Sequence, residues 1–398
     1  MATLVRKNMQ HAVILAACRT PIGKFHGGLS ALSAPELGAV AIRASLERAC
    51  VATDQVDEVI FGNVLAAGVG QAPARQAALK AGLPPSVAAV TINKVCGSGL
   101  KAIMLATQAI RSGDADVVVA GGMESMSRAP YLLSRESPMF GDRTLADAML
   151  TDGLLCPFSG RSMGQIAENL AQSDGITREA QDRYACESHR RAVAAQERGA
   201  FNNEIASVTV HTRAGHQDVT RDEGPRADTT LARLSSLRPV FSDDGTVTAG
   251  NSSMISDGAA AVVVASEQFA KTRGLTPLAR VVASATSGTE PGDLLIAPVA
   301  AIRKVLSRAA VLLDDVDLVE VNEAFAAQML ACLQRLDLSP EKTNVNGGAI
   351  ALGHPLGASG ARVTATLIHA LRERQRRLGL AALCLGGGNA VAALFERL

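Results

Sequence analysis

The stretch that decides the fold runs from residue 93 to residue 122 and reads NKVCGSGLKAIMLATQAIRSGDADVVVAGG. A turn of small residues precedes a helical pattern at 100–112, an apolar strand pattern at 116–120 and two glycines. The same order returns near the C-terminus, where Gly357-Ala358-Ser359-Gly360 precedes a helical pattern, a strand pattern and three glycines. This echo predicts a chain built from two similar halves.

Strand and helix patterns alternate on both sides of the chain's middle. Short apolar runs typical of buried strands lie at 12–17, 58–61, 116–120, 260–265, 279–283, 318–321 and 381–385. Helical periodicity lies between many of them, at 35–49, 72–81, 100–112, 300–309 and 361–371. This alternation predicts crossover units and a mostly parallel sheet.

The middle of the chain has a different character. From 123 to 250 the strand signal fades, charged residues become more frequent, and the clearest helix is at 184–198. Proline, glycine and serine interrupt residues 134–164. We therefore expect a large, partly irregular insertion in an α/β frame.

The composition fits a large, tightly packed α/β protein. The 398 residues suggest two or three domains, and 47% of them are hydrophobic while only 3% are aromatic. Alanine, valine, leucine and isoleucine must therefore form the core, and the 36 glycines allow backbones to approach closely.

Charge and cysteine usage exclude several classes of protein. The 39 basic and 38 acidic residues give a formal charge of +1, which argues against binding to nucleic acid or to a membrane surface. Seven scattered cysteines without a CxxC pair indicate a reducing compartment, and we expect a cytoplasmic protein.

The apolar run at 12–17 is too short for a membrane span or a secretion signal. The sequence has no zinc spacing and no phosphate-binding lysine motif, so we expect no metal.

Cys96 is the first candidate for chemistry. It follows an extended segment and directly precedes a helical pattern, where free N–H groups and the helix dipole favour a thiolate. Residue type alone leaves a buried, inert cysteine equally open.

The same turn also fits a dinucleotide-binding pattern, through Gly97, Gly99 and Ala102. The match is weak because Asn93 and Lys94 stand where an apolar strand is expected. No acidic residue ends a following strand in the usual place.

Three further residues are candidates, each with an ordinary structural alternative. His354 lies among glycines and a proline ahead of a helix. It is either a catalytic base or an ordinary histidine of a loop. Cys384 lies near the end of a strand, at the sheet edge where the active sites of parallel sheets are usually found. It is either an active-site residue or a core residue. Asn322 follows the strand pattern at 318–321, and its residue type favours a helix cap.

Four segments together resemble the signature blocks of the thiolase family, in family order and near family spacing. The resemblance extends over residues 12–398. The blocks are Asn93-Lys94-Val95-Cys96-Gly97-Ser98-Gly99, Asn322-Glu323-Ala324-Phe325, Asn346-Gly347-Gly348-Ala349 with Gly353-His354-Pro355, and Cys384-Leu385-Gly386-Gly387-Gly388.

The resemblance implies an acyltransferase of lipid metabolism that catalyses reversible Claisen condensation and thiolysis among acyl-CoA, acetyl-CoA and 3-ketoacyl-CoA. Cys96 would carry the acyl group after passing its proton to His354. Cys384 would remove the α-proton of the second acyl-CoA. His354 and a water held by Asn322 would stabilise the enolate, and the N–H groups of Cys96 and Gly386 would bind the oxyanion.

The resemblance also implies a fold and a ligand. The fold is two duplicated α/β halves in five layers, α-β-α-β-α, each half with a five-stranded mixed sheet. The expected parts are an N-terminal half at 1–122 plus 251–272, a loop domain covering CoA at 123–250, and a C-terminal half at 273–398. Coenzyme A would be substrate and product rather than a tightly bound cofactor, held by Ser253, Arg226, Met163 and Phe325. The chain would form a homodimer or homotetramer.

Several positions depart from the family pattern. Ser162 replaces a histidine of acetoacetyl-specific members, Met254 replaces a glycine, and apolar residues fill 294–297. Tyr131 stands where a histidine is frequent. These changes predict an altered acyl pocket, so the choice between an acetoacetyl-CoA thiolase and a broader 3-ketoacyl-CoA thiolase stays open.

Two rival functions are less consistent with these residues. A ketosynthase acting on acyl-carrier-protein substrates lacks the second cysteine, which is present here as Cys384. A non-catalytic acyl-CoA-binding relative has no need to keep Cys96, Asn322, His354 and Cys384 together.

Overall fold

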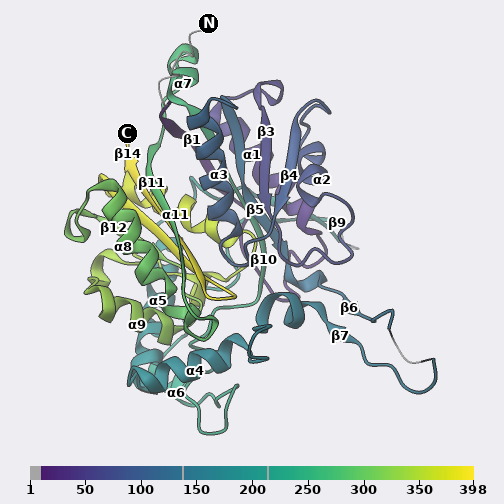
Figure 1. Cartoon of the computed structure of the whole chain (residues 1–398), viewed down its shortest axis with the longest axis vertical. Helices are drawn as coiled ribbons and strands as arrows, with labels where there is room; N and C mark the ends of the chain where they lie inside the picture. The colour runs from purple at the N-terminus through teal and green to yellow at the C-terminus, as the bar shows by residue number, and fades with distance from the viewer. Residues whose placement is uncertain (1–9, 137–138, 213–214) are drawn as a thin grey trace, which may run out of the picture.

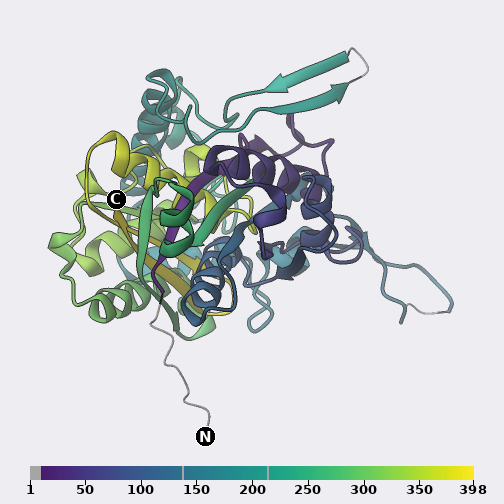
Figure 2. The same ribbon diagram turned by 90° about the horizontal axis from the view of Figure 1, so that it is seen from above.

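The computed structural model describes residues 10–136, 139–212 and 215–398 (Figures 1 and 2). Residues 1–9 of the predicted N-terminal half, and residues 137, 138, 213 and 214 of the predicted insertion, lie outside the described residues. Among the described residues, none of the helices has the length and apolar character that crossing a membrane requires.

The N-terminal half contains the five-stranded mixed sheet that the resemblance implies. Strand β3 is parallel to β4 and β5, whereas β10 is antiparallel to β5 and β1. A short strand, β2 (Gly23–Lys24), pairs with β10. The order across the sheet is β4 (Ala88–Ile92), β3 (Glu58–Gly62), β5 (Val117–Ser125), β10 (Ser256–Ser266) and β1 (Ala12–Arg19).

The C-terminal half has four strands and a single bridge in place of the fifth. Only β12 and β13 are parallel, and the isolated parallel bridge between Val319 and Thr343 lies beyond β12. Pairing of Val13 and Ile14 with β11 joins the two halves into one ten-stranded sheet. The order is β12 (Leu318–Val321), β13 (Leu378–Leu385), β14 (Asn389–Arg397) and β11 (Ala279–Gly288).

The expectation of a mostly parallel sheet was wrong. Most neighbouring strands are antiparallel, because the chain returns by hairpins as well as by helical crossovers. The clearest case is the turn at Gly387 and Gly388, whose φ angles of 81° and 82° allow β13 to reverse into β14.

Helices form three layers around the two parts of the sheet, which confirms the five-layer arrangement (Figure 1). One buried cluster joins the N-terminal sheet to an outer layer, and a second joins the C-terminal sheet to the opposite outer layer. A third cluster lies between the two parts of the sheet and surrounds two central helices. The outer helices are α1 (Ala34–Ala49), α2 (Pro73–Lys80), α8 (Ala297–Ala309) and α9 (Ala326–Leu336), the central ones are α3 (Ser98–Ser112) and α11 (Ser359–Glu373), and α7 (Glu267–Arg273) and α10 (Ala349–Leu352) are shorter connections.

The two central helices are the echoed elements of the two halves, and their main chains touch. A methyl group on Gly99 would lie 2.6 Å from the backbone nitrogen of Ala361. A methyl group on Gly360 would lie 2.2 Å from the backbone nitrogen of Leu100. Equivalent glycines therefore bring the starts of α3 and α11 together, and with them the loops that carry Cys96 and His354.

The insertion lies between β5 and β10, and the predicted helix at 184–198 falls largely within its longest helix. Its two hairpins, β6–β7 and β8–β9, project from the body (Figures 1 and 2). Its elements are β6 (Tyr131–Leu132), β7 (Ala146–Asp147), a π-helical turn (Met149–Leu154), α4 (Met163–Ser173), α5 (Arg178–Glu197), β8 (Val208–Thr212), β9 (Gly215–Val219) and α6 (Leu231–Ser235).

A buried ionic cluster fastens the insertion to the frame. Arg19 at the end of β1 pairs with Glu204 at 2.6 Å and with Asp222 at 2.6 Å. All three side chains are buried. Asp222 also accepts the backbone N–H of Ile22 at 2.8 Å, so its carboxylate has several donors.

Asp222→Ala should destabilise the protein by about 3–5 kcal/mol, because it leaves the buried Arg19 cation without its main partner. Urea unfolding of the purified protein measures the change. Asp228→Ala is the matched control, since it breaks an exposed pair with Arg233 and should cost about 1 kcal/mol or less. Equal losses in the two variants would contradict a structural role for the buried cluster.

Candidate active site

The turn before α3 holds Cys96 in a strained but well-supported position. Val95 has a φ of 45°, in the left-handed region that a β-branched residue seldom adopts. The hydroxyl of Ser98 supports the turn, because it accepts the N–H of Lys94 at 2.8 Å and donates to the carbonyl of Val95 at 2.7 Å. The turn therefore presents Cys96 immediately ahead of the helix.

A narrow inner chamber brings residues of both halves and of the insertion together. Its volume is about 50 Å³, and it is half-enclosed by apolar side chains. The predicted residues that line it are Cys96, His354, Cys384, Gly386, Met163, Ser253 and Phe325. Both predicted cysteines and the predicted histidine thus face one space.

A wider outer cavity of about 570 Å³ adjoins the chamber. Met163, Ser253, Phe325 and His354 line both spaces, so the two are continuous. Arg226 lines the outer cavity only. An elongated ligand with a polar end near Arg226 can therefore reach the chamber.

His354 is held by hydrogen bonds on its ring and on its backbone. Its Nδ1 lies 2.6 Å from the hydroxyl of Ser359, and its backbone N–H reaches the carbonyl of Met254 at 3.0 Å. Burial, and then the positive charge of Arg362, lower the pKa of His354 to about 3. The imidazole is therefore neutral at physiological pH and can accept a proton.

The thiol of Cys96 is protonated at rest, because burial outweighs the backbone N–H groups that were expected to favour its thiolate. Burial raises the pKa of Cys96 to about 11, although backbone hydrogen bonds from Gly386 and from Cys96 itself oppose the rise. Desolvation of a charged sulfur outweighs these backbone hydrogen bonds here. Burial, followed by the nearby Cys96 and Cys332, raises the pKa of Cys384 well above its usual range. Both cysteines line the same inner chamber.

Asn322 is a site residue and not a helix cap. The capping residue of α9 is Phe325, three residues later. Asn322 is fully buried, and its amide nitrogen lies 3.4 Å from both ring nitrogens of His354. Within the described part of the chain its amide oxygen, Oδ1, has no protein partner.

The turn before α3 has no space for a dinucleotide, so the alternative of dinucleotide binding is excluded. A methyl group on Gly97 would lie 2.3 Å from a methyl carbon of Leu385, and Gly99 packs against α11. The glycines accommodate the protein's own second half, which leaves no room for a pyrophosphate. Nor do the described residues contain a group of three or more acidic, histidine or cysteine side chains able to hold a metal.

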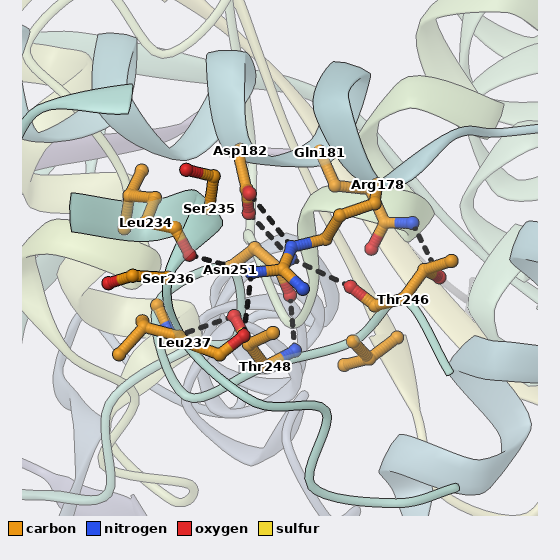
Figure 3. A network of polar contacts seen from close by, with 12 residues as sticks. Arg178, Gln181, Asp182, Leu234, Ser235, Ser236, Leu237, Thr246, Thr248 and Asn251 are labelled. Atoms are coloured by element: carbon orange, nitrogen blue, oxygen red, sulfur yellow. Dashed lines mark hydrogen bonds and ion pairs between the residues drawn. The ribbon is translucent and has the colours of Figure 1, made fainter. Parts of the chain in front are cut away.

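A polar network includes residues that line the outer cavity (Figure 3). Arg178 on α5 pairs with Asp182 at 2.7 Å and donates to the carbonyls of Leu234 and Leu237, whose side chains line the cavity. Asp182 in turn accepts the amide of Asn251 at 3.0 Å. The network therefore fixes the cavity wall and the segment that leads to Ser253.

The positions that depart from the family pattern fall in different places. Leu294 and Leu295 line the inner chamber, whereas Met254 and Ser162 line the outer cavity. Ser162 also caps α4 by accepting the N–H of Gln165. Tyr131 lies in β6, is 69% exposed and lines neither space. The prediction that Tyr131 helps to alter the acyl pocket was therefore wrong.

Sequence reasoning missed other lining residues and one buried acid. Gly153 and Leu154 come from the π-helical turn and Leu356 from the His354 loop, and no residue pattern singles them out. Glu124 is buried and accepts the N–H of Gly357 at 2.9 Å, which ties the His354 loop to the N-terminal half. The sequence contained a signal for Glu124, because an acidic residue at the end of the apolar strand in GGMES would be buried and would need hydrogen-bond donors.

The comparisons with known proteins give matches over nearly the whole chain. The family models "Thiolase, N-terminal domain" and "Thiolase, C-terminal domain" match residues 12–268 and 275–397. An acetyl-CoA acetyltransferase of Escherichia coli is 53% identical over 98% of this chain and 100% of its own. An enzyme of the same name from Cupriavidus necator has the same identity and coverage.

Two solved structures share the whole fold. The Bacillus anthracis acetyl-CoA acetyltransferase has a TM-score of 0.97 and 44% identity, and it covers 98% of this chain and 100% of its own. Human mitochondrial 3-ketoacyl-CoA thiolase has a TM-score of 0.95 and 43% identity with the same coverage. With family models across nearly all of its length, and both cysteines and the histidine gathered in one chamber, the chain belongs to the thiolase family.

Proposed function

We propose that this thiolase joins and splits acyl chains carried on coenzyme A, using Cys96, His354 and Cys384 as its reacting groups. The observation that carries the proposal is the inner chamber, where two thiols and a neutral imidazole meet. A ketosynthase would lack the second thiol, and a mere binder of acyl-CoA has no use for the three groups together.

In the first half-reaction the sulfur of Cys96 attacks the thioester carbon while its proton passes to His354. The oxyanion accepts the backbone N–H groups of Cys96 and Gly386, and the hydrogen bond between Gly386 and the sulfur supports this placement. Collapse expels the CoA thiolate, which takes the proton back from His354. The neutral resting state means that proton transfer and attack occur together.

In the second half-reaction the thiol of Cys384 gives its proton to His354, and the resulting thiolate removes the α-proton of a second acyl-CoA. The carbanion then attacks the acyl group on Cys96. The bond to the Cys96 sulfur breaks, the Cys96 thiolate takes the proton from His354, and a 3-ketoacyl-CoA leaves. The enolate oxygen needs donors because the α-proton is very weakly acidic. We assign this role to His354 and to a water held by the unpaired Oδ1 of Asn322.

Coenzyme A occupies the outer cavity as substrate and product in this proposal. Ser253, Met163 and Phe325 line the route to the chamber, where the pantetheine arm must pass. Arg226 lies farther out, where its charge suits a phosphate. The cavity volume of about 570 Å³ accommodates part of a ligand of this length.

We also propose the division into parts at 1–122 plus 251–272, 123–250 and 273–398. The insertion's position between β5 and β10 supports it, although β5 itself runs on to Ser125.

Seven free cysteines support a reducing compartment such as the cytoplasm. Self-association as a dimer or tetramer is supported by β4, a sheet-edge strand with Val90 40% exposed, and by Phe140, 97% exposed on the β6–β7 loop.

The acyl preference is proposed to extend beyond acetoacetyl-CoA. Ser162 stands in place of a histidine, and Leu294 and Leu295 shape the chamber where the acyl group must lie. Apolar walls offer no polar contact that would single out one short chain.

Steady-state rates in both directions over 3-ketoacyl-CoA substrates of increasing length test this function. We expect turnover of several lengths, and Leu295→Ala should favour longer chains by about 10-fold because it enlarges the chamber. Leu312→Ala, at a site 72% exposed, is the control and should leave the profile unchanged. A sharp optimum at acetoacetyl-CoA would overturn the acyl preference, and absence of cleavage at every length would overturn the assigned chemistry.

A further inference from the structure

Ser359, the first residue of α11, makes the shortest polar contact to the imidazole of His354. Its oxygen lies 2.6 Å from Nδ1, and both side chains are buried. The same oxygen lies 2.8 Å from the carbonyl oxygen of Pro355, one helical turn earlier. The serine thus connects the histidine ring to a main-chain carbonyl.

The hydroxyl has one proton, and the carbonyl of Pro355 can only accept. When Ser359 donates to Pro355, its oxygen is left to accept, so Nδ1 of His354 must carry the ring hydrogen. In the reverse arrangement Ser359 would donate to Nδ1, the ring hydrogen would move to Nε2, and the hydrogen bond from Ser359 to the carbonyl of Pro355 would be lost. The amide nitrogen of Asn322 lies 3.4 Å from both ring nitrogens and so favours neither tautomer, which leaves the hydroxyl of Ser359 to decide between them.

We propose that Ser359 is a positioning residue that fixes the tautomer of His354, keeping the hydrogen on Nδ1 and leaving Nε2 free to take the proton of Cys96. The proposal rests on the function proposed above, in which His354 is the base. Gly99 and Gly360 bring the starts of α3 and α11 together, and Ser359 lies at the start of α11, directly after the loop that carries His354.

One arrangement serves both proposed half-reactions. The bare Nε2 first accepts the thiol proton, and the resulting imidazolium keeps its Nδ1–H on the Ser359 oxygen. Nε2 then carries a hydrogen, which it can donate to a substrate oxygen or return to the leaving CoA. The serine makes the same hydrogen bond throughout, so no rearrangement of the buried loop is needed.

The test combines the rate of acylation with direct observation of the ring. Ser359→Ala should slow acylation by an acyl-CoA about 10–100-fold, the loss typical of groups that orient a functional histidine in metal sites, with half-saturation unchanged. Nitrogen-15 NMR of labelled His354 should show the Nδ1–H tautomer in the parent protein and a shift toward Nε2–H in Ser359→Ala. Ser359→Thr, which keeps the hydroxyl, should restore the parent spectrum.

The matched control is Thr364→Val in the same helix. Thr364 is buried and donates to the carbonyl of Gly360, four residues back, at 2.8 Å, but it does not contact His354. Its loss should leave the acylation rate and the ring spectrum unchanged. An unchanged spectrum in Ser359→Ala would overturn the tautomer proposal alone, whereas undiminished acylation in His354→Ala would overturn the proposed base and with it the function above.

Discussion

Cys96→Ala should take up no acyl group from an acyl-CoA, and its overall turnover should fall by about 10⁴-fold or more. The physical reason is that no other thiol of the chamber sits in the turn where Gly386 and Cys96 offer backbone N–H groups. Cys384 lines the same chamber, but its own pKa is raised well above the usual range by burial and by both neighbouring thiols. It cannot replace the lost nucleophile.

Intact-protein mass spectrometry after mixing with acyl-CoA measures this result. The parent enzyme should gain the mass of one acyl group, and Cys96→Ala should gain none while unfolding at the same urea concentration. Cys332→Ala is the matched control, because Cys332 is fully buried nearby and lies outside the chamber. Acylation of Cys96→Ala at any other side chain would refute the assigned nucleophile.

Cys384→Ala should separate the two half-reactions. It should still become acylated at Cys96, since its removal leaves His354 and the backbone donors in place. It should lose exchange of the α-hydrogens of acetyl-CoA with deuterated water by about 10²–10⁴-fold, because the group that removes the proton is missing. Proton NMR of acetyl-CoA in heavy water follows the exchange.

The same Cys332→Ala protein serves as control and should exchange at the parent rate. Exchange at the parent rate in Cys384→Ala would contradict the role of Cys384 as the base. Loss of acylation together with exchange would instead mean that Cys384 supports the chamber as a whole. The two measurements therefore distinguish a chemical role from a packing role.

The sequence predicted the frame well where short apolar runs or helical periodicity were clear. The pattern at 318–321 corresponds to β12, and those at 35–49 and 361–371 fall within α1 and α11 with small shifts. Strand β14 was missed because its alanine-rich run after three glycines shows neither clean alternation nor helical spacing. Helix α4 was also missed, although Ser162 and Gln165 form a capping-box pattern at its start.

The candidate site was predictable as a set of residues and not as an electrostatic environment. Repeated signature blocks identified Cys96, His354, Cys384 and Asn322, and the structure gathers them. Burial reversed the expected shift in the pKa of Cys96, because desolvation depends on packing between halves far apart in the chain. The hydrogen-bond partner of His354 could not be predicted from spacing either, since Ser359 lies five positions later, across a turn.

The contact of Gly99 with Ala361 and of Gly360 with Leu100 has a consequence for mutational tolerance. Main-chain atoms, not side chains, set the separation between the thiol-bearing turn and the imidazole-bearing loop. Apolar substitutions in the surrounding layers can therefore accumulate at a cost in stability while the spacing of the reacting atoms is preserved. A single added methyl group at either glycine would force the two loops apart.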